Sequence, residues 1–529
     1  MRVLITDKIN EIAKNILLEG ANIEVDVLPT MSEDDLCKAI VDYDALMIRS
    51  ETKVTKKVLE AAKNLKIVGR AGVGVDNVDV ESATQSGVIV VNSPDGNTTA
   101  AAEHTIALML SMARNIPAAV ASTKSGLWER SKFTGTEVFG KTLGIIGLGK
   151  IGSHVAKVAL ALGMKVVVCD PYTSKEAVEA IGAEYVAHLD DFWGRCDFIT
   201  VHAPKTRETT HLININSINR MKKGVKIVNC ARGGIIDESA LKEAIESGQV
   251  GAAALDVYEA EPDIKSSPML GVEGNVVLTP HLGASTSEAQ LNVAIDVAHQ
   301  IKEVLGGGSA TSAVNIPSLK PAILEPVKDY MQLAENIGEL AQQIGEGNLK
   351  SIEIIAKGKL ATLDISPLET AIIKGIFSSF TSGINYVNAP ILAKQKGISV
   401  TTSKSESSGD YIGLITVKLI TNTTESLVSG ALIAENIRRI VKIDQYNTSI
   451  EPEKHMLLVP HENKPSMIAK VATVIGEAGI NINHMHVVQK QGDKSLMVIN
   501  TDNAVEKEVI EQIEKIDGIS TSKYVKLTA

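Results

Sequence analysis

The chain reads Thr142-Leu143-Gly144-Ile145-Ile146-Gly147-Leu148-Gly149-Lys150-Ile151-Gly152, an apolar run followed by three spaced glycines. Such a glycine spacing alone is a weak signal, because glycines are common in turns. Here the apolar run predicts a strand, and an amphipathic helix that ends at Gly163 follows it. In that setting Gly147 permits a tight turn, Gly149 lets the backbone approach a pyrophosphate, and Gly152 allows the helix to pack closely on the strand. A glycine turn in some other α/β fold is the alternative.

The residues after this motif bear on the choice of nucleotide. The N–H groups at the start of the helix, from Lys150 and Ile151 onward, face the phosphates in such a motif. The next predicted strand, Lys165–Cys169, ends in Asp170, which lies 18 positions after Gly152. A carboxylate there accepts hydrogen bonds from both ribose hydroxyls and repels a 2′-phosphate, and no arginine follows it directly. The sequence therefore predicts NAD, and not NADP, as the cofactor.

The motif belongs to a longer alternation of strands and helices. Between about Lys141 and Pro280 we predict strands at Thr142–Ile146, Lys165–Cys169, Phe198–Val201, Lys226–Asn229, Ala252–Asp256 and Val276–Leu278. Before residue 97 we predict strands at Val3–Ile5, Ala45–Ile48, Lys66–Val68 and Val88–Val91, with helices at Ile9–Glu19 and Ser32–Val41. Long helices are expected at Thr98–Arg114 and Ser287–Leu305. Both alternations indicate parallel sheets covered by helices, which is an α/β fold.

A further region begins after the flexible run Gly306-Gly307-Gly308-Ser309. We place a domain boundary near residues 317–320, because Pro317 and Pro321 follow that run. From 318 to 452, strand-like runs at Ser351–Ala356 and Tyr411–Leu419 alternate with helices such as Leu368–Thr381. The rest alternates strand, helix, strand, strand, helix, strand, at His455–Val459, Ser466–Glu477, Ile482–Val488, Ser495–Thr501, Ala504–Ile516 and Thr521–Leu527. That order is typical of a ferredoxin-like sandwich.

The bulk composition fits a globular protein of several domains. At 529 residues, and at roughly 150 residues per domain, three or four domains are expected. The net charge of −10 argues against nucleic acid as the main partner, since such a partner favours a basic face. No apolar run approaches about 18 residues, and the first residues read as a strand and not as a secretory signal. We therefore predict a cytoplasmic protein without membrane contact.

The chain contains four cysteines, at Cys37, Cys169, Cys196 and Cys230. They are widely spaced and include no Cys-x-x-Cys pair. That pattern favours reduced thiols over a disulfide framework or a zinc site, and we expect no metal site.

Three patches of polar side chains follow later strands of the second alternation, where α/β sheets place ligands. The patches are Asn229–Gly234, Glu259–Pro262 and Thr279–Ala284. They supply Arg232, Glu261 and His281. An NAD enzyme that oxidises a 2-hydroxy acid needs a cation for the substrate carboxylate, an imidazole to remove the hydroxyl proton, and a carboxylate to orient the imidazole. Taken alone, Arg232 could cap a helix, Glu261 could lie in a solvated turn, and His281 could be an ordinary loop residue.

The order Gly147–Gly152, Arg232, Glu261, His281 resembles that of the D-isomer-specific 2-hydroxyacid dehydrogenases, from residue 1 to about 316. The resemblance implies a Rossmann-type nucleotide domain, 98–287, inserted in a flavodoxin-like substrate domain, 1–97 and 288–316. The active site of that family lies in the cleft between the two. The resemblance also implies that Arg232, Glu261 and His281 are catalytic, that Ala231 lies at the cofactor, and that Asp256 contacts its nicotinamide end.

Further stretches resemble the phosphoglycerate dehydrogenase branch of that family. They are Ile48–Ser50, Val68–Asn77, Asn92–Asn97 and Trp128–Arg130. The resemblance implies that the substrate is bound by Arg49, Arg70, Gly74, Val75 and Asn97. It also places Arg130 and Lys132 near the phosphate of a neighbouring subunit. The chemistry agrees, because a small molecule with a phosphate and a carboxylate needs several permanently charged donors. Ordinary surface charge is the alternative for Arg49 and Arg70.

Together these features imply NAD-dependent oxidation of D-3-phosphoglycerate to 3-phosphohydroxypyruvate, the first step of the phosphorylated route to serine, with His281 as general base. Two other interpretations stay open. A glyoxylate or hydroxypyruvate reductase shares the three catalytic residues, although Asp170 and the long C-terminal region argue against it. A non-catalytic NAD-sensing regulator built on the same fold can also retain those residues.

Dehydrogenase chemistry does not need residues 318–529. Residues 453–529 resemble an ACT domain, an amino-acid-sensing module, at His461-Glu462-Asn463-Lys464-Pro465 and Gly479-Ile480-Asn481-Ile482-Asn483. The resemblance implies that His461, Asn463 and Asn481 hold L-serine as an effector between paired ACT domains. Ser466 departs from the family, which usually has glycine there, and this puts the effector in doubt. Pairing of ACT domains without a ligand is the alternative.

Residues 318–452 resemble the α/β intervening domain of the long form of that branch. The resemblance implies a role in assembling a homotetramer. Arg438 and Arg439, which we place on a helix, are candidates for an anion site there. A solvated pair on a helix surface is the alternative.

Overall fold

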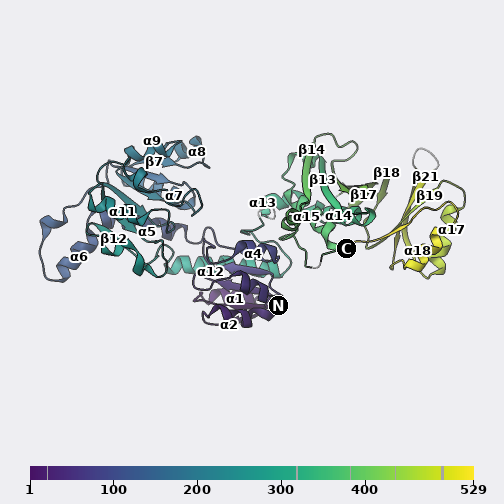
Figure 1. Cartoon of the computed structure of the whole chain (residues 1–529), viewed down its shortest axis with the longest axis horizontal. Helices are drawn as coiled ribbons and strands as arrows, with labels where there is room; N and C mark the ends of the chain where they lie inside the picture. Colours follow the sequence, from purple (N-terminus) through teal and green to yellow (C-terminus); the bar gives the residue numbers. More distant parts are fainter. Residues whose placement is uncertain (21, 317–319, 382, 435–436, 490–493, 529) are drawn as a thin grey trace.

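The computed structural model describes every residue except 21, 317–319, 382, 435–436, 490–493 and 529. Most of the boundary predicted near 317–320 therefore lies outside the described residues. Figure 1 shows the sheets and their helices arranged in a row, from the sheet with β7 and β12 at one end to the sheet with β19 and β21 at the other. No single helix in the described part is long and apolar enough to cross a membrane. By length and composition, α5 (Thr98–Ala113) and α6 (Ile116–Lys124) pass such a test only as a pair bent by 63°.

The N-terminal sheet is parallel, in the order β2-β1-β3-β4-β5. Its strands are β1 (Arg2–Ile5), β2 (Glu24–Val27), β3 (Ala45–Ile48), β4 (Ile67–Arg70) and β5 (Ile89–Val91), and its helices are α1 (Ile12–Leu18), α2 (Glu33–Ala39), α3 (Lys56–Ala61) and α4 (Val80–Gln85). The order confirms the flavodoxin-like prediction. The sequence prediction missed β2, because this strand lies at the sheet edge and is only partly buried. A later helix, α12 (Ser287–Leu305), returns to this sheet and shares its hydrophobic core.

The second sheet is also parallel, in the order β12-β11-β10-β9-β6-β7-β8. Its strands are β6 (Thr142–Ile146), β7 (Lys165–Cys169), β8 (Glu184–Tyr185), β9 (Phe198–Val201), β10 (Val225–Asn229), β11 (Val250–Leu255) and β12 (Val276–Leu278). Its helices are α5, α6, α7 (Lys150–Ala161), α8 (Lys175–Ala180), α9 (Leu189–Phe192), α10 (Ile215–Ile218) and α11 (Glu238–Glu246). The strand order reverses between β6 and β9, where Rossmann-type sheets bind dinucleotides. The Rossmann prediction is confirmed.

Both faces of this second sheet are buried. Val167 and Ile199 enter one hydrophobic core, and the next positions, Val168 and Phe198, enter the other. Strands buried on both faces read as continuous apolar runs, so the sequence located them well.

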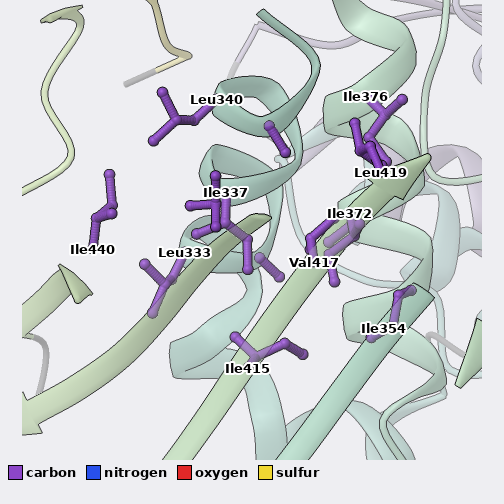
Figure 2. Close-up of a cluster of buried hydrophobic side chains, with 14 of the residues drawn as sticks. Leu333, Ile337, Leu340, Ile354, Ile372, Ile376, Ile415, Val417, Leu419 and Ile440 are labelled. Atoms are coloured by element: carbon purple, nitrogen blue, oxygen red, sulfur yellow. The ribbon is translucent and has the colours of Figure 1, made fainter. Parts of the chain in front are cut away.

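The third sheet has the order β14-β13-β15-β16-β17-β18. Its elements are α13 (Pro321–Leu324), α14 (Met331–Ile344), β13 (Leu349–Gly358), α15 (Ser366–Ser378), α16 (Ala389–Gln395), β14 (Ser399–Ser405), β15 (Gly413–Thr421), β16 (Glu425–Ala434), β17 (Ile437–Ile443) and β18 (Tyr446–Ile450). In the core shown in Figure 2, helically spaced residues of α14 gather with alternate residues of β15, namely Leu333, Ile337 and Leu340 with Ile415, Val417 and Leu419.

Arg438 and Arg439 lie on β17 and not on a helix, so this part of the prediction was wrong. β17 pairs with β16 on one side and β18 on the other. Its sequence contains three isoleucines and a valine, and such β-branched residues favour a strand in a sheet.

The C-terminal sheet is antiparallel, in the order β20-β21-β19-β22. Its elements are β19 (His455–Glu462), α17 (Met467–Glu477), β20 (Ile482–Gln489), β21 (Lys494–Thr501), α18 (Lys507–Glu514) and β22 (Lys523–Lys526). The ferredoxin-like prediction is confirmed. Leu457 and Val459 point into the core beneath α17 and α18, whereas Met456 and Leu458 enter the core of the third sheet. The two C-terminal sheets therefore share one hydrophobic core.

Candidate active site

Three loops at the carboxyl edge of the second sheet carry the predicted catalytic groups. Arg232 follows β10, Glu261 follows β11 and His281 follows β12, and these strands are neighbours. Nδ1 of His281 lies 2.7 Å from Oε2 of Glu261. An ionised carboxylate only accepts hydrogen bonds, so Nδ1 carries the proton and Nε2 remains as the acceptor. The His281 side chain is 49% exposed, which leaves it accessible to a substrate.

The loop that carries Glu261 is fixed by two carboxylates. The N–H of Tyr258 donates to Oε1 of Glu261 at 2.7 Å, so both oxygens of this carboxylate have a partner. The buried Glu238, at the start of α11, accepts from the N–H of Glu259 at 2.6 Å and from the hydroxyl of Ser267. These bonds hold the loop at both ends. The sequence analysis missed Glu238, because a glutamate in a first helical turn gives no sign of what it binds.

Arg232 reaches from the second sheet to the loop after β4 in the first sheet. Its Nε donates to Oδ2 of Asp76 at 3.1 Å, and its Nη1 donates to the carbonyl of Ala231 at 2.7 Å. A side chain at Gly74 would collide with the guanidinium, so glycine is needed for this approach. The predicted residues Arg232, Ala231 and Gly74 are thus brought together between the two sheets, where the active-site cleft was predicted. Asp76 was not predicted.

Two more guanidinium groups lie at the same cleft. Burial, followed by the nearby charge of Arg232 and then that of Arg49, lowers the pKa of Arg70 to about 10, although Asp76 opposes this effect. The hydrogen bonds that the structure gives Arg49 run through its backbone, to Asp7 and Asn77. Three like charges therefore face one another, an arrangement that an anionic ligand stabilises.

Polar atoms beside this cluster are buried without partners. Among the described residues they are Nε of Arg70, Oγ of Ser93, Oδ1 of Asn97 and Oγ1 of Thr98. An unpaired buried polar atom costs about 1–3 kcal/mol, so a cluster of them points to a ligand or to bound water. The backbone N–H groups of Gly74 and Val75, both predicted to bind substrate, likewise have no backbone acceptor in the part of the chain that the structure describes.

The glycine loop between β6 and α7 has the conformation that its motif predicts. Gly147 has a φ of 92°, which glycine adopts without strain. A side chain at Gly152 would collide with the carbonyl oxygen of Gly147, whereas an added Cβ at Gly149 would meet no atom within 4 Å. No side chain caps the start of α7, and Ile151 packs into the core beneath it. The uncapped N–H groups beside this open space form a site for a phosphate group.

Asp170 follows β7 and closes onto the glycine loop. Its Oδ2 accepts from the N–H of Leu148 at 2.6 Å, and its Oδ1 accepts from the N–H of Tyr172 at 2.7 Å. Lys150, the first residue of α7, forms an ion pair with Asp95 of the first sheet's last loop. Lys150 therefore crosses the cleft, as Arg232 does. Asp95 was not predicted.

Asp256 is fully buried, and its carboxylate accepts four hydrogen bonds. The donors are Nε2 of His104 at 3.1 Å, Oγ1 of Thr279 at 2.6 Å, and the N–H groups of Leu282 and Gly283, each at 2.8 Å. Burial opposes ionisation, but these bonds outweigh it and hold the pKa of Asp256 below its ordinary value. The sequence analysis missed His104. A lone imidazole in an alanine-rich helix was the only sign of it.

The residues predicted to hold serine lie in the C-terminal sheet. His461 is buried on β19, with Nδ1 3.2 Å from the carbonyl oxygen of Val459, whereas Asn463 and Asn481 are exposed. Among the described residues of this chain, no hydrogen bond joins the three. Ser466 has a φ of 69°, in the left-handed region that favours glycine. The residue Ser466 therefore occupies a backbone position that glycine would adopt without strain.

The remaining predicted cations are spread over the surface. Arg130 and Lys132 lie in an exposed 3₁₀ helix, and Lys132 pairs with Glu129 at 3.5 Å. Arg439 pairs with Glu451 at 2.6 Å, and Nε of Arg438 is buried without a partner among the described residues.

Three family models match the chain. The NAD binding domain of D-isomer specific 2-hydroxyacid dehydrogenases matches residues 106–283. The D-3-phosphoglycerate dehydrogenase intervening domain matches residues 326–444, and the ACT domain matches residues 455–518. Each match falls on a different sheet of the fold.

Individual relatives extend over the whole chain. The chain is 46% identical to the D-3-phosphoglycerate dehydrogenase of Synechocystis sp., over 99% of this chain and 95% of that protein. It is 44% identical to the D-3-phosphoglycerate dehydrogenase of Archaeoglobus fulgidus, over 100% of both. A solved structure of D-lactate dehydrogenase from Aquifex aeolicus, complexed with NAD and lactic acid, covers 58% of this chain and 96% of that chain, with 27% identity and a TM-score of 0.52.

Proposed function

The chain belongs to the D-3-phosphoglycerate dehydrogenase family, and on that premise we propose that it oxidises D-3-phosphoglycerate to 3-phosphohydroxypyruvate with NAD. This reaction is the first step of the phosphorylated route to serine. One observation carries the choice of substrate: Nε of Arg70 is buried without a partner among the described residues, close to the like charges of Arg49 and Arg232. Asp76 pairs with Arg232, and a small molecule with a phosphate and a carboxylate supplies further negative charge for the three groups.

The glycine loop fits NAD. The open space at Gly149 leaves room for a pyrophosphate, which the uncapped N–H groups of α7 and the charge of Lys150 would bind. Asp170 would accept ribose hydroxyls beside its two backbone donors. Bound NAD accepts the hydride that leaves C2 of the substrate. We assign Ala231, just after β10, to the nicotinamide side. Asp256, just after the neighbouring β11, is fully buried, so in this proposal it supports that side from behind.

His281 acts as the general base in this proposal. Its Nε2 takes the proton of the C2 hydroxyl as that carbon becomes a carbonyl. Glu261, which holds the proton on Nδ1, fixes the ring and stabilises the imidazolium that forms. Arg232 pairs with the substrate carboxylate and stabilises the charge on the new carbonyl oxygen.

The phosphate is assigned to the side of the cleft formed by the first sheet. Arg49 and Arg70 supply the charges, while Gly74, Val75 and Asn97 supply unpaired polar groups. We expect Arg49→Ala to raise KM for 3-phosphoglycerate far more than KM for an unphosphorylated hydroxy acid such as glycerate. Equal effects on both substrates would contradict the phosphate role.

We propose four functional units. These are 1–97 with 288–316 for the substrate, 98–287 for NAD, 318–452 for assembly, and 453–529 for regulation. The first two are supported by their separate cores and by the return of α12 to the first sheet. The last two share a core, so we expect them to move together.

The surface around α6 supports assembly into a homotetramer. This helix has no buried residue, and Trp128 just after it is 82% exposed. Apolar surface of this kind marks interfaces between protein chains. Light scattering of the purified chain tests the tetramer, and a dimer or monomer at micromolar concentration would contradict it.

We propose regulation by L-serine at His461, Asn463 and Asn481, and action in the cytoplasm. The ACT domain supports control by a small ligand. Titration of L-serine into the reaction tests the effector. We expect the rate to fall as L-serine is added, although L-serine does not resemble the substrate.

The experiment that tests the whole proposal is NAD reduction at 340 nm with 3-phosphoglycerate, beside lactate, glycerate and 2-hydroxyglutarate. We expect kcat/KM to be highest for 3-phosphoglycerate. Activity on an unphosphorylated acid alone would keep the mechanism and reject the substrate. No activity at all would favour a non-catalytic NAD-binding protein.

A further inference from the structure

His104 takes part in a buried hydrogen-bond network behind the catalytic loop, and the proposed mechanism gives it no role. We propose that His104 is a positioning residue that acts through Asp256 to fix the loop presenting His281 to the substrate. The inference rests on the proposed function, in which His281 is the general base.

The first link joins α5 to Asp256. Nε2 of His104 lies 3.1 Å from Oδ1 of Asp256 and 3.3 Å from Oγ1 of Thr279. An ionised carboxylate only accepts, so the imidazole nitrogen is the donor in this contact. The His104 side chain is only 20% exposed and Asp256 is fully buried. Hydrogen bonds to charged groups are stronger than those between neutral groups, which makes this one of the stronger bonds of the region.

The second link joins Asp256 to the catalytic loop. Its carboxylate accepts from the N–H groups of Leu282 and Gly283, directly after His281. Its backbone carbonyl accepts from the N–H of His281 itself at 2.9 Å. Asp256 thus binds three successive N–H groups of this loop, and so sets the direction in which the imidazole points.

His281 needs such support because its backbone is strained. Its φ is 55°, a left-handed conformation that residues with a side chain rarely adopt. Conformations of this kind are unfavourable and persist only where the surroundings impose them. The carboxylate of Asp256, held in turn by His104, is the group that imposes it here.

α5 also connects the catalytic loop to the substrate loop. An added Cβ on Gly283 would lie 4.0 Å from Cβ of Ala101, so the loop rests on α5 one turn before His104. The same helix begins after Asn97, whose Oδ1 is buried and unpaired among the described residues. His104 lies about 10 Å further along the helix, at 1.5 Å per residue. One rigid element therefore carries both a proposed substrate contact and the support of the base.

The test compares His104→Leu with His104→Gln in the full chain. The glutamine amide nitrogen can donate from about the position of Nε2, whereas leucine removes the donor. We expect His104→Leu to lower kcat and kcat/KM together by about 10- to 100-fold, because a group displaced by about 1 Å loses up to that much. NADH affinity, read by fluorescence, should change by less than about twofold, and His104→Gln should recover most of the rate.

A double-mutant cycle separates positioning from general support of the fold. In a His281→Ala background, His104→Leu should change the residual rate by less than about twofold, because no base remains to be positioned. An equal loss in both backgrounds would overturn the proposal, as would a loss that His104→Gln does not relieve. If His104→Leu does not fold, Thr279→Val, which removes another donor to Asp256, takes its place in the cycle.

The cycle also separates this inference from the choice of substrate. If the wild type prefers another 2-hydroxy acid, the same variants are measured with that acid, and the predicted ratios stand. A wild type inactive on every acid of the panel would overturn both the proposed function and the role of His104.

Discussion

The substrate cleft and the helical layer of the third sheet both bury charged groups, but they treat them in opposite ways. In the cleft, the like charges of Arg49, Arg70 and Arg232 lie close together. Arg232 pairs with Asp76, but Nε of Arg70 has no partner among the described residues. Between α14 and α15, Lys374 pairs with the buried Glu335 at 2.5 Å.

The charged groups around Lys374 and Glu335 find their partners within the chain. The ammonium of Lys374 also lies 4.5 Å from the ring centre of Tyr386, whose hydroxyl donates to the other oxygen of Glu335 at 2.6 Å. One turn along α14, Glu339 accepts from the N–H of Thr528 at 2.7 Å, which ties the end of the chain to this layer. A buried cluster in which every charged group has an ion-pair or hydrogen-bond partner is complete by itself. One that gathers like charges is complete only with a ligand, and this difference separates structure from function.

The largest effect is expected in the cleft, from His281→Gln. Loss of the general base should lower kcat by about 10²–10⁴-fold. The melting temperature should stay close to that of the wild type, because half of the side chain is exposed. The exposed His188 serves as a control, since His188→Gln should leave both kcat and melting temperature unchanged. Wild-type turnover in His281→Gln would remove His281 from the mechanism.

In the cluster around Lys374, we expect the substitution Lys374→Met to lower stability and to leave kcat unchanged. Removing one partner of a buried ion pair typically costs about 3–5 kcal/mol, because the other charge stays buried. We expect a clear fall in the melting temperature of the C-terminal half and an unchanged kcat at temperatures where the protein is folded. Lys328→Met is the matched control, because the Lys328–Glu325 pair is exposed and screened by solvent, so its loss should change stability little. If Lys374→Met lost activity without losing stability, the cluster around Lys374 would not be purely structural, and the comparison with the cleft would fail.

The substitution Arg70→Met tests the cleft directly, because Nε of Arg70 has no partner among the described residues. A charge-assisted hydrogen bond is worth about 1.5–3 kcal/mol, so KM for 3-phosphoglycerate should rise by about 10- to 100-fold. Stability should stay equal or increase, because the substitution removes a buried charge that like charges repel. Enzyme kinetics gives KM and thermal melting gives the stability, both on the same sample. Marked destabilisation would mean that Arg70 supports the fold and is not kept for a ligand.

Acid should weaken the network around Asp256. Like the Lys374 cluster, this network is satisfied within the chain, although it lies beside the cleft. Its pKa is lower in the folded chain than in the unfolded one, because four donors outweigh the effect of burial. The stability that it contributes is therefore complete above its unfolded pKa of about 3.9 and is lost as the pH falls through its folded pKa. Unfolding by urea between pH 2 and 6 should depend less on pH in Asp256→Asn. An unchanged pH profile would contradict this.

The smallest effect is expected in the ACT domain, from Ser466→Gly. The left-handed backbone of Ser466 is one that glycine adopts freely, so the substitution should stabilise the protein by about 0.5–1 kcal/mol. It should also lower the L-serine concentration needed for inhibition, if the serine side chain crowds the effector. Thermal melting and serine titration give the two values. A destabilised variant would show that Ser466 makes contacts that compensate for its backbone.

The sequence predicted most of the catalytic half because its strands are buried on both faces. The bounds predicted for β6, β7, β9 and β12 agree with the structure, since each strand is mostly apolar. The edge strand β2 and the strand β17, which carries two arginines, were missed or misassigned. Their mixed polarity does not distinguish a half-buried strand from a loop or a helix.

The same limit applies to the site. Arg232, Glu261 and His281 were found because each lies in a polar patch just after a strand. His104, Glu238 and Asp76 act from a helix interior, a first helical turn and the opposite sheet. Their roles depend on which segments the fold brings together, and no local spacing encodes that.

The most direct test of the central claim is calorimetric titration of 3-phosphoglycerate into the protein saturated with NADH, where no turnover occurs. We predict one site per chain, with affinity reduced at least about tenfold in Arg70→Met and unchanged in Lys328→Met. Affinity should also fall as the salt concentration rises, because the cleft attracts the ligand by charge. Equal affinity in wild type and Arg70→Met would contradict the claim that the clustered cations of the cleft form the substrate site.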